Sequence, residues 1–260
     1  MPAHDLSLLI NAAQEAGKIA CMYTGPTAQV WDKPDGAGPV TEADLAVNEA
    51  LEQRLRSARP DYGWLSEESL DNSERQSCDY VFIVDPIDGT RSFIEGSQTW
   101  AHSLAIAHNG SVVAAVVYLP LRNKLYYASK GQGAFLNGDA ITCSTQTQLE
   151  GAQVLAAKPM TDPRHWRDTV PAFARGYRPS LAYRMALVAD GSYDAMLTLR
   201  PTWEWDIAAG DPILREAGAT SSDRFGNPLQ FNNPDPRLAG IVAGTPPVQT
   251  DILDALKAAT

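Results

Sequence analysis

The stretch VFIVDPIDGT, residues 81–90, places two carboxylates three residues apart at the end of an apolar run. Residues 81–84 have the length and β-branched character of a buried strand, so we expect Asp85 and Asp88 to emerge where that strand ends and a loop begins. Carboxylates and backbone carbonyls are the ligands that Mg²⁺ prefers, and Gly89 lets backbone N–H groups approach an anion held by the metal. The alternative is an ordinary Asp/Gly turn, which is the usual explanation for Asp-Pro or Asp-Gly alone.

The overall composition describes a folded protein and argues against some partners. Hydrophobic residues make up 44% of the 260 residues and charged residues 20%, as in globular chains. The formal net charge is -10, with 31 acids against 21 bases, which argues against binding a nucleic-acid polymer. The acidic excess suits a protein that collects cations, although a solvated acidic surface accounts for most of these residues.

Cysteine usage and hydropathy indicate the cytoplasm. The three cysteines, Cys21, Cys78 and Cys143, lie far apart without metal-ligand spacing, so we expect buried thiols in a reducing compartment. The N-terminal segment has no basic region, and its apolar positions are spaced as in a helix rather than a signal peptide. No stretch approaches the roughly 20 apolar residues of a membrane span. We therefore expect no membrane contact.

Helical and strand patterns succeed each other along the first part of the chain. Apolar positions at helical spacing predict helices over residues 8–23 and 45–55, separated by a Gly/Pro-rich loop over 31–39. Two apolar runs, 104–107 and 112–119, flank Asn109-Gly110, which is a strong hairpin signal. A third run at 125–127 follows. These strands predict an antiparallel meander.

Beyond residue 150 strands alternate with helices. The expected strands are 154–156, 195–199 and 241–242, and the expected helices are 182–188, one from Asp206, and 252–258. We therefore divide the chain into a first half, residues 1–150, of α+β type with an antiparallel sheet, and a second half, residues 151–260, of α/β type that completes the site.

Three further acidic positions join the first two as candidates, and each has a simpler explanation. Glu67 follows a short apolar stretch, as a ligand at a strand end would, but paired glutamates in loops are usually solvent-exposed. Asp44 stands three residues after Thr41, which is equally the pattern of a helix capping box. Asp206 opens a predicted helix, where the dipole favours an acid with or without a metal.

Taken together these segments resemble the inositol monophosphatase superfamily, which comprises Mg²⁺-dependent, Li⁺-sensitive phosphatases of small phosphate esters. The resemblance rests on four motifs in the family's order: PVTEAD at 39–44, SEE at 66–68, DPIDGT at 85–90 and WDIAAG at 205–210. It implies a layered αβαβα sandwich with the site at the seam between the two halves. It also implies a homodimer that acts on a small phosphorylated metabolite.

The resemblance assigns five residues to two or three Mg²⁺ ions. It implies that Glu67, Asp85 and the carbonyl of Ile87 hold one ion, and that Asp85, Asp88 and Asp206 surround a second. Glu67 would hold a third, weaker ion through water. Li⁺ would take the second metal position.

The resemblance also assigns the catalytic and substrate-binding groups. Thr90, oriented by Asp44, would position or deprotonate the nucleophilic water, with Glu67 beside it. The amides of Gly89 and Thr90, at the start of a helix, would bind phosphate oxygens. The general chemistry does not depend on the family, because metal ions can polarise a phosphoryl group and lower the pKa of water.

For the substrate, the details are closest to the CysQ-type 3′(2′),5′-bisphosphate nucleotidases. These details are LSEE at 65–68, Arg91, PTWEWD at 201–206, and Arg184 where that group carries a Lys. Arg184 and Glu204 are accordingly the substrate-binding candidates, although Arg184 could instead be a helix-surface base in an ion pair.

Other functions remain open at the level of sequence. The alternatives are an inositol-1-monophosphatase or broad sugar-phosphate phosphatase and, from DGTRSFI at 88–94, a histidinol-phosphate phosphatase. A catalytically silent protein that binds metal or a phosphometabolite is a different class, disfavoured by the intact set of acids.

Overall fold

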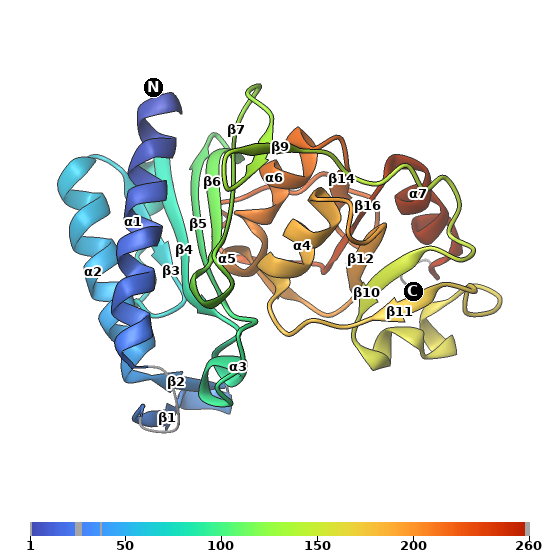
Figure 1. Ribbon diagram of the computed structural model, residues 1–260, viewed down its shortest axis with the longest axis horizontal. Coiled ribbons are helices and arrows are strands. Elements are labelled where there is room, and N and C mark those ends of the chain that lie inside the picture. Colours follow the sequence, from blue (N-terminus) through green and yellow to red (C-terminus); the bar gives the residue numbers. More distant parts are fainter. Residues whose placement is uncertain (1, 24–27, 37, 258–260) are drawn as a thin grey trace.

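The computed structural model describes residues 2–23, 28–36 and 38–257. Its elements stack as helices, sheet, helices, sheet and helix, which confirms the predicted αβαβα sandwich (Figure 1). The helices of the three helical layers are α1 (Pro2–Met22) and α2 (Glu42–Ala58), then α4 (Leu181–Ala189), α5 (Glu204–Ile207) and α6 (Gly210–Glu216), and finally α7 (Pro246–Ala255).

The first sheet has seven strands in sequential order. Only β3 and β4 run parallel; every later neighbour is antiparallel, as the predicted meander requires. Asn109 and Gly110 form the predicted hairpin turn, both with positive φ, between β5 and β6. The strands are β3 (Gly63–Ser66), β4 (Tyr80–Asp88), β5 (Ala101–His108), β6 (Ser111–Leu119), β7 (Lys124–Ser129), β8 (Ala134–Leu136) and β9 (Asp139–Ile141).

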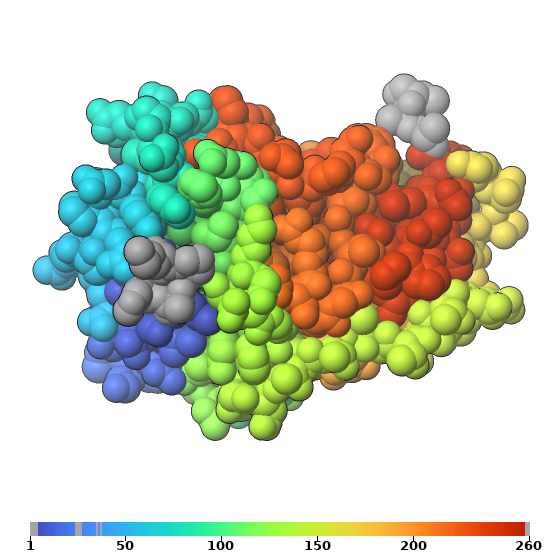
Figure 2. Space-filling view, turned by 90° about the horizontal axis from the view of Figure 1, so that it is seen from above, coloured from blue at the N-terminus to red at the C-terminus, as the bar shows by residue number. Residues whose placement is uncertain are grey.

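The second sheet has five strands in the order β11-β10-β12-β16-β14. β10 is parallel to β11 and β12, whereas β16 is antiparallel to β12 and β14. The chain between β9 and β10 runs along the surface from the first sheet to the second (Figures 1 and 2), and the predicted division near residue 150 falls in this segment. The strands are β10 (Gln153–Ala156), β11 (Ala174–Gly176), β12 (Ala195–Thr198), β14 (Thr220–Ser222) and β16 (Ile241–Gly244).

Three buried clusters fill the layers. The outer cluster lies between α1, α2 and the first sheet and includes Leu9, Val47, Leu51, Phe82 and Leu104. The central cluster joins the two sheets around α4 and α6 and includes Ile83, Ala105, Met185, Ile213 and Ala243. A third cluster under α7 includes Val154, Leu197, Val242, Val248 and Ile252. Because the central cluster draws on both halves, the seam between them is packed as a core.

Some boundaries differ from the sequence prediction. The last helix begins at Pro246 rather than at residue 252, because proline is favoured in the first helical turn; residue 258 lies outside the described residues. The segment predicted as a loop over 31–39 contains two short antiparallel strands, β1 (Val30–Asp32) and β2 (Pro39–Thr41). None of the helices that the structure describes is both long and apolar enough to span a bilayer. Among the described residues no disulfide forms, but Cys21 is exposed near the end of α1 rather than buried.

Candidate metal centre and catalytic cavity

Asp85 and Asp88 lie within strand β4, not beyond its end as the sequence suggested. The strand continues because its pairing with β5 survives a β-bulge: Asp85 stands opposite Ser103 and Asp88 opposite Ala101. Two residues of β4 therefore face one residue of β5 between these pairs. The extra residue keeps the acids in a hydrogen-bonded frame rather than in a free loop.

The bulge decides which way the two carboxylates point. Side chains alternate along a regular strand, so residues three apart would face opposite sides. Residues 81–84 follow that rule, with the odd positions in the central cluster and the even positions in the outer cluster. Past the bulge the order is inverted, and Ile87 packs in the outer cluster. Asp88 is thereby turned to the same face as Asp85.

A third carboxylate reaches this face from the second half. Asp206 lies on the short helix α5, and one oxygen from each of Asp85, Asp88 and Asp206 lies within 4.8 Å of the others. Burial, and then the neighbouring carboxylates, raise the pKa of Asp85 and of Asp206 well above the usual range. Such a cluster of hard oxygen ligands fits a divalent cation, whose charge would relieve the repulsion.

Hydrogen bonds fix two of these acids. One oxygen of Asp85 accepts from the amide of Ile87 at 2.9 Å. Oδ2 of Asp88 accepts from the hydroxyl of Ser180 at 2.6 Å and from the amide of Ala182 at 2.7 Å, at the start of α4. Burial raises the pKa of Asp88 to about 6, although these bonds oppose the rise. Asp88 therefore ties the first half to a helix of the second.

Glu67 lines the same cavity but stands apart from the group of three. It follows β3, and its carboxylate accepts from the ammonium of Lys33 at 2.7 Å, while Glu68 accepts from the same ammonium at 2.6 Å. Both glutamates are thus paired with a lysine from the segment before β2. The predicted ligands Glu67, Asp85 and Asp206 face one common cavity, as a shared metal site requires.

Thr90 and Asp44 are in contact, as the sequence predicted. The hydroxyl of Thr90 lies 3.3 Å from Oδ1 of Asp44 and 3.2 Å from the carbonyl of Ile87. The other oxygen, Oδ2, accepts from the amide and hydroxyl of Thr41 at 2.8 and 2.5 Å, completing the capping box of α2. The capping box predicted for Asp44 is therefore confirmed, and its other oxygen contacts Thr90. Burial raises the pKa of Asp44 to about 6, against the opposing hydrogen bonds from Thr41.

The loop after Asp88 turns into a short helix. α3 (Thr90–Ile94) begins at Thr90, and Gly89 precedes it with a φ of 103°, a left-handed conformation that favours glycine. Gly89 and Thr90 both line the cavity. The predicted helix start is confirmed.

The cavity lies between the halves and has a volume of about 670 Å³. The first half contributes Glu67, Asp85, Asp88, Arg91 and the Gly89–Thr90 turn, and the second half contributes Asp206, Arg184, Arg200 and Tyr177. Arg184 is nearly buried; its Nε donates to the carbonyl of Arg178, and its guanidinium lies 4.7 Å from the ring centre of Tyr177. Carboxylates and guanidinium groups thus line one space, a charge arrangement that suits a bound metal together with an anionic substrate.

Three predicted site residues do not line the cavity: Asp44 and Ile87, which contact Thr90 behind it, and Glu204. The side chain of Glu204 is completely buried, and its two oxygens accept from the amides of Asn232 and Asn233 at 2.6 and 2.8 Å. The Asn233 side chain donates a third bond at 2.7 Å. Glu204 therefore anchors the segment 232–233, and its geometry offers no support for substrate contact.

Several groups at the site were not predicted from the sequence. Lys33 pairs with the glutamates, Ser180 holds Asp88, and Arg200 and Tyr177 line the wall. An Arg directly before the predicted PTWEWD motif was a usable signal for Arg200. Ser180 gave none beyond its position as a helix cap, since its contact with Asp88 spans 92 residues.

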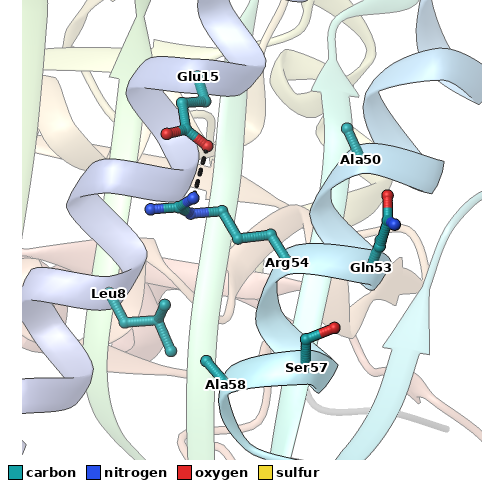
Figure 3. Close-up of a pocket in the computed structure, with 7 residues that line it drawn as sticks. All are labelled: Leu8, Glu15, Ala50, Gln53, Arg54, Ser57 and Ala58. Atoms are coloured by element: carbon teal, nitrogen blue, oxygen red, sulfur yellow. Dashed lines mark ion pairs between the residues drawn. The ribbon is translucent and has the colours of Figure 1, made fainter.

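Another hollow, between α1 and α2, lacks these features (Figure 3). Among its lining residues Glu15 is the sole carboxylate, and it forms an ion pair with Arg54 at 2.9 Å across the groove. An acid that is already neutralised at an open surface gives no reason to gather a metal.

Comparisons with known proteins agree with this geometry. The model of the inositol monophosphatase family matches residues 2–259. An inositol-1-monophosphatase from Mesorhizobium japonicum is 31% identical, covering 97% of this chain and 96% of the relative. The Nus factor SuhB of Escherichia coli K12 is 32% identical over 97% and 98% of the two chains. The crystal structure of the extragenic suppressor protein SuhB from Bartonella henselae is similar with a TM-score of 0.82 at 28% identity, covering 99% of this chain and all of that one.

Proposed function

The chain belongs to the inositol monophosphatase family of metal-dependent phosphatases, and on that premise we propose that it hydrolyses a bisphosphate nucleotide with Mg²⁺ as cofactor. The best single candidate is a 3′(2′),5′-bisphosphate nucleotidase that converts adenosine 3′,5′-bisphosphate to AMP. The observation that carries this choice is that the guanidinium groups of Arg184 and Arg200 line the same cavity as the acids. A substrate with a second phosphate needs such cations.

The metal would be held by the acids of the first half and by Asp206. We assign Asp85, Asp88 and Asp206 to one Mg²⁺, and Asp85, the carbonyl of Ile87 and Glu67 to another, with Glu67 contributing to a weaker third. When bound, Mg²⁺ supplies polarisation of the phosphoryl group and neutralises the charge of the dianion. The oxygen-only ligand set supports this choice of metal.

Proton transfer is assigned to Thr90 and Asp44. Thr90 Oγ1 would accept a proton from the attacking water while giving its own proton to Asp44 Oδ1 along the observed contact. The water oxygen would then form its bond to phosphorus as the bond to the ester oxygen breaks, and the released alkoxide would take a proton from a solvent water, whose hydroxide would recover the proton held by Asp44. The pKa of Asp44, about 6, suits a base that must be ionised near neutral pH. The amides of Gly89 and Thr90 would bind phosphate oxygens.

Inositol 1-phosphate is the second candidate, supported by the relative that bears the name inositol-1-monophosphatase. Broad sugar-phosphate and histidinol-phosphate hydrolysis remain further candidates. A homodimer and a cytoplasmic location are also part of the proposal, on the strength of family membership and composition. Light scattering of the purified chain would measure the oligomeric state.

A turnover panel tests the substrate. Adenosine 3′,5′-bisphosphate, inositol 1-phosphate and histidinol phosphate would be compared with Mg²⁺, for the wild type and for Arg184→Gln and Arg200→Gln. Loss of a charge-assisted contact should lower kcat/KM for the bisphosphate by about tenfold or more, with a smaller change for the other two. Arg54→Gln, in the remote groove between α1 and α2, is the matched control. Equal losses on all substrates would remove the bisphosphate assignment, and no phosphate release at all would indicate a silent binding protein.

A further inference from the structure

A histidine lies directly behind the acidic strand, on the face away from the cavity. His102 is the single residue of β5 that stands opposite the two bulged residues, Pro86 and Ile87. Its side chain is fully buried among aromatic rings, with Trp100 at 5.4 Å and Tyr118 at 6.3 Å between ring centres. Its Nδ1 is hydrogen-bonded to the carbonyl oxygen of Pro86.

The polar groups of the bulge are met by specific partners. The amide of Ile87 donates to the carboxylate of Asp85, and the carbonyl of Ile87 accepts from Thr90. Pro86 has no N–H, so its carbonyl is its sole backbone hydrogen-bonding group. A buried carbonyl at a bulge, where the ladder is interrupted, requires a donor from elsewhere. His102 provides this donor.

We propose that His102 is a positioning residue for the metal centre: its bond to Pro86 holds the bulge that turns Asp85 and Asp88 to one face. This inference rests on the proposed function, in which those two acids bind the metal. Without the bulge, the spacing of three would place one carboxylate in the outer cluster. Residues that orient metal ligands without touching the metal typically contribute ten- to a hundredfold in affinity.

The geometry also fixes the state of the ring. A carbonyl only accepts, so Nδ1 must carry the proton. Nε2 then bears a lone pair, and it has no hydrogen-bond partner among the residues that the structure describes. Burial lowers the pKa of His102 to about 4, so the ring stays neutral near pH 7. His102 thus donates a hydrogen bond to the strand without placing a positive charge behind the acids.

Two substitutions separate this role from packing. His102→Asn keeps an N–H donor at the position of Nδ1. Leu has the same number of non-hydrogen side-chain atoms as Asn but no donor, so His102→Leu removes the bond. The Mg²⁺ dissociation constant, measured by calorimetry, should rise ten- to a hundredfold in the Leu variant. The Asn variant should stay within about threefold of wild type, since it restores the bond. Melting in EDTA, measured alongside, reports any general loss of folding.

A spectroscopic measurement on the wild type is independent of both variants. With ¹⁵N-labelled histidine, the His102 ring should show the Nδ1–H form from pH 6 to 8. Its signal is assigned as the histidine resonance that is missing from the spectrum of the Asn variant. A ring protonated at Nε2 would overturn the proposal, even if the Leu variant failed to fold. Equal Mg²⁺ affinity in the Asn and Leu variants would also overturn it. A wild type that binds no Mg²⁺ would overturn the proposed metal site itself, a result distinct from both.

Discussion

Replacing Asp88 by Asn should stabilise the metal-free protein while weakening its response to Mg²⁺. Burial raises the pKa of Asp88 from 3.8 to about 6, so the folded state binds a proton more tightly than the unfolded chain. At about 1.4 kcal/mol for each pKa unit, the ionised carboxylate lowers the free energy of unfolding by about 3 kcal/mol at pH 8. Below pH 4 the carboxyl is protonated in both the folded and the unfolded state, so the folded protein keeps its full stability. This part of the free energy of unfolding is lost as the pH rises through about 6 and Asp88 ionises.

The Asn variant removes the charge but keeps a carbonyl that can accept from Ser180 and Ala182. Because a neutral acceptor forms weaker bonds than a carboxylate, we expect a net gain of about 2 kcal/mol at pH 8. For a chain of this size, that gain corresponds to a rise in melting temperature of roughly 4–8 °C. The gain should shrink at pH 5, where the wild-type carboxyl is mostly protonated.

Thermal melting followed by circular dichroism, in EDTA and in excess Mg²⁺, measures both effects. Wild type should gain stability from Mg²⁺, and the Asn variant should gain much less. Asp211→Asn is the matched control, because Asp211 is also buried with a raised pKa but pairs with Arg215 and Ser221 outside the cavity. Because its pKa is also raised, that variant should likewise gain stability in EDTA at pH 8, but it should keep the full Mg²⁺ response. If Asp88→Asn melts below wild type in EDTA at pH 8, the cost of burying the ionised carboxylate does not dominate and the reasoning fails.

Four further outcomes follow from the same cavity. Thr90→Ala should lower kcat by about a hundredfold or more while Thr90→Ser retains most activity, and equal rates would exclude the hydroxyl from proton transfer. Activity of the Mg²⁺-loaded enzyme should rise with pH as Asp44 ionises, and this rise should disappear in Asp44→Asn; an unchanged profile would assign that step elsewhere. Lys33→Gln should tighten Mg²⁺ binding several-fold in calorimetry, because it frees Glu67 from a competing cation, and weaker binding would contradict this. LiCl should inhibit turnover where NaCl at the same concentration does not.

The sequence predicted the strands and helices that carry the site because their signals are local. The Asn109-Gly110 turn, the apolar stripe of α1 and the capping box at Thr41 each depend on neighbours in the chain. The two explanations weighed for Asp44 did not compete, since its two oxygens serve different partners. Spacing alone could not show this, because a motif does not specify individual atoms.

The features that the sequence could not supply are those made by distant contacts. Asp85 and Asp88, three apart, face one side only because of a bulge whose partner is the side chain of His102. Glu204 lies two residues from Asp206, and the sequence predicts that it binds the substrate. In the structure its two carboxylate oxygens instead accept hydrogen bonds from the amides of residues 232–233. The two acids belong to the same motif, but residues two positions apart on a helix do not share a face, so Glu204 and Asp206 point to different sides of α5.

The same hydrogen bonds hold the acidic cluster and join the two halves at their seam. Asp88 of the first sheet accepts from Ser180 and Ala182 of the second half. Ser103, opposite Asp85 on β5, donates to the carbonyl of Trp205, next to Asp206. These bonds bring a third carboxylate into a cluster that repels itself without a cation. The packed central cluster therefore opposes that repulsion in the metal-free state, and a bound cation would add its own attraction to the same seam. Metal binding should accordingly stabilise the contact between the halves more than either half alone.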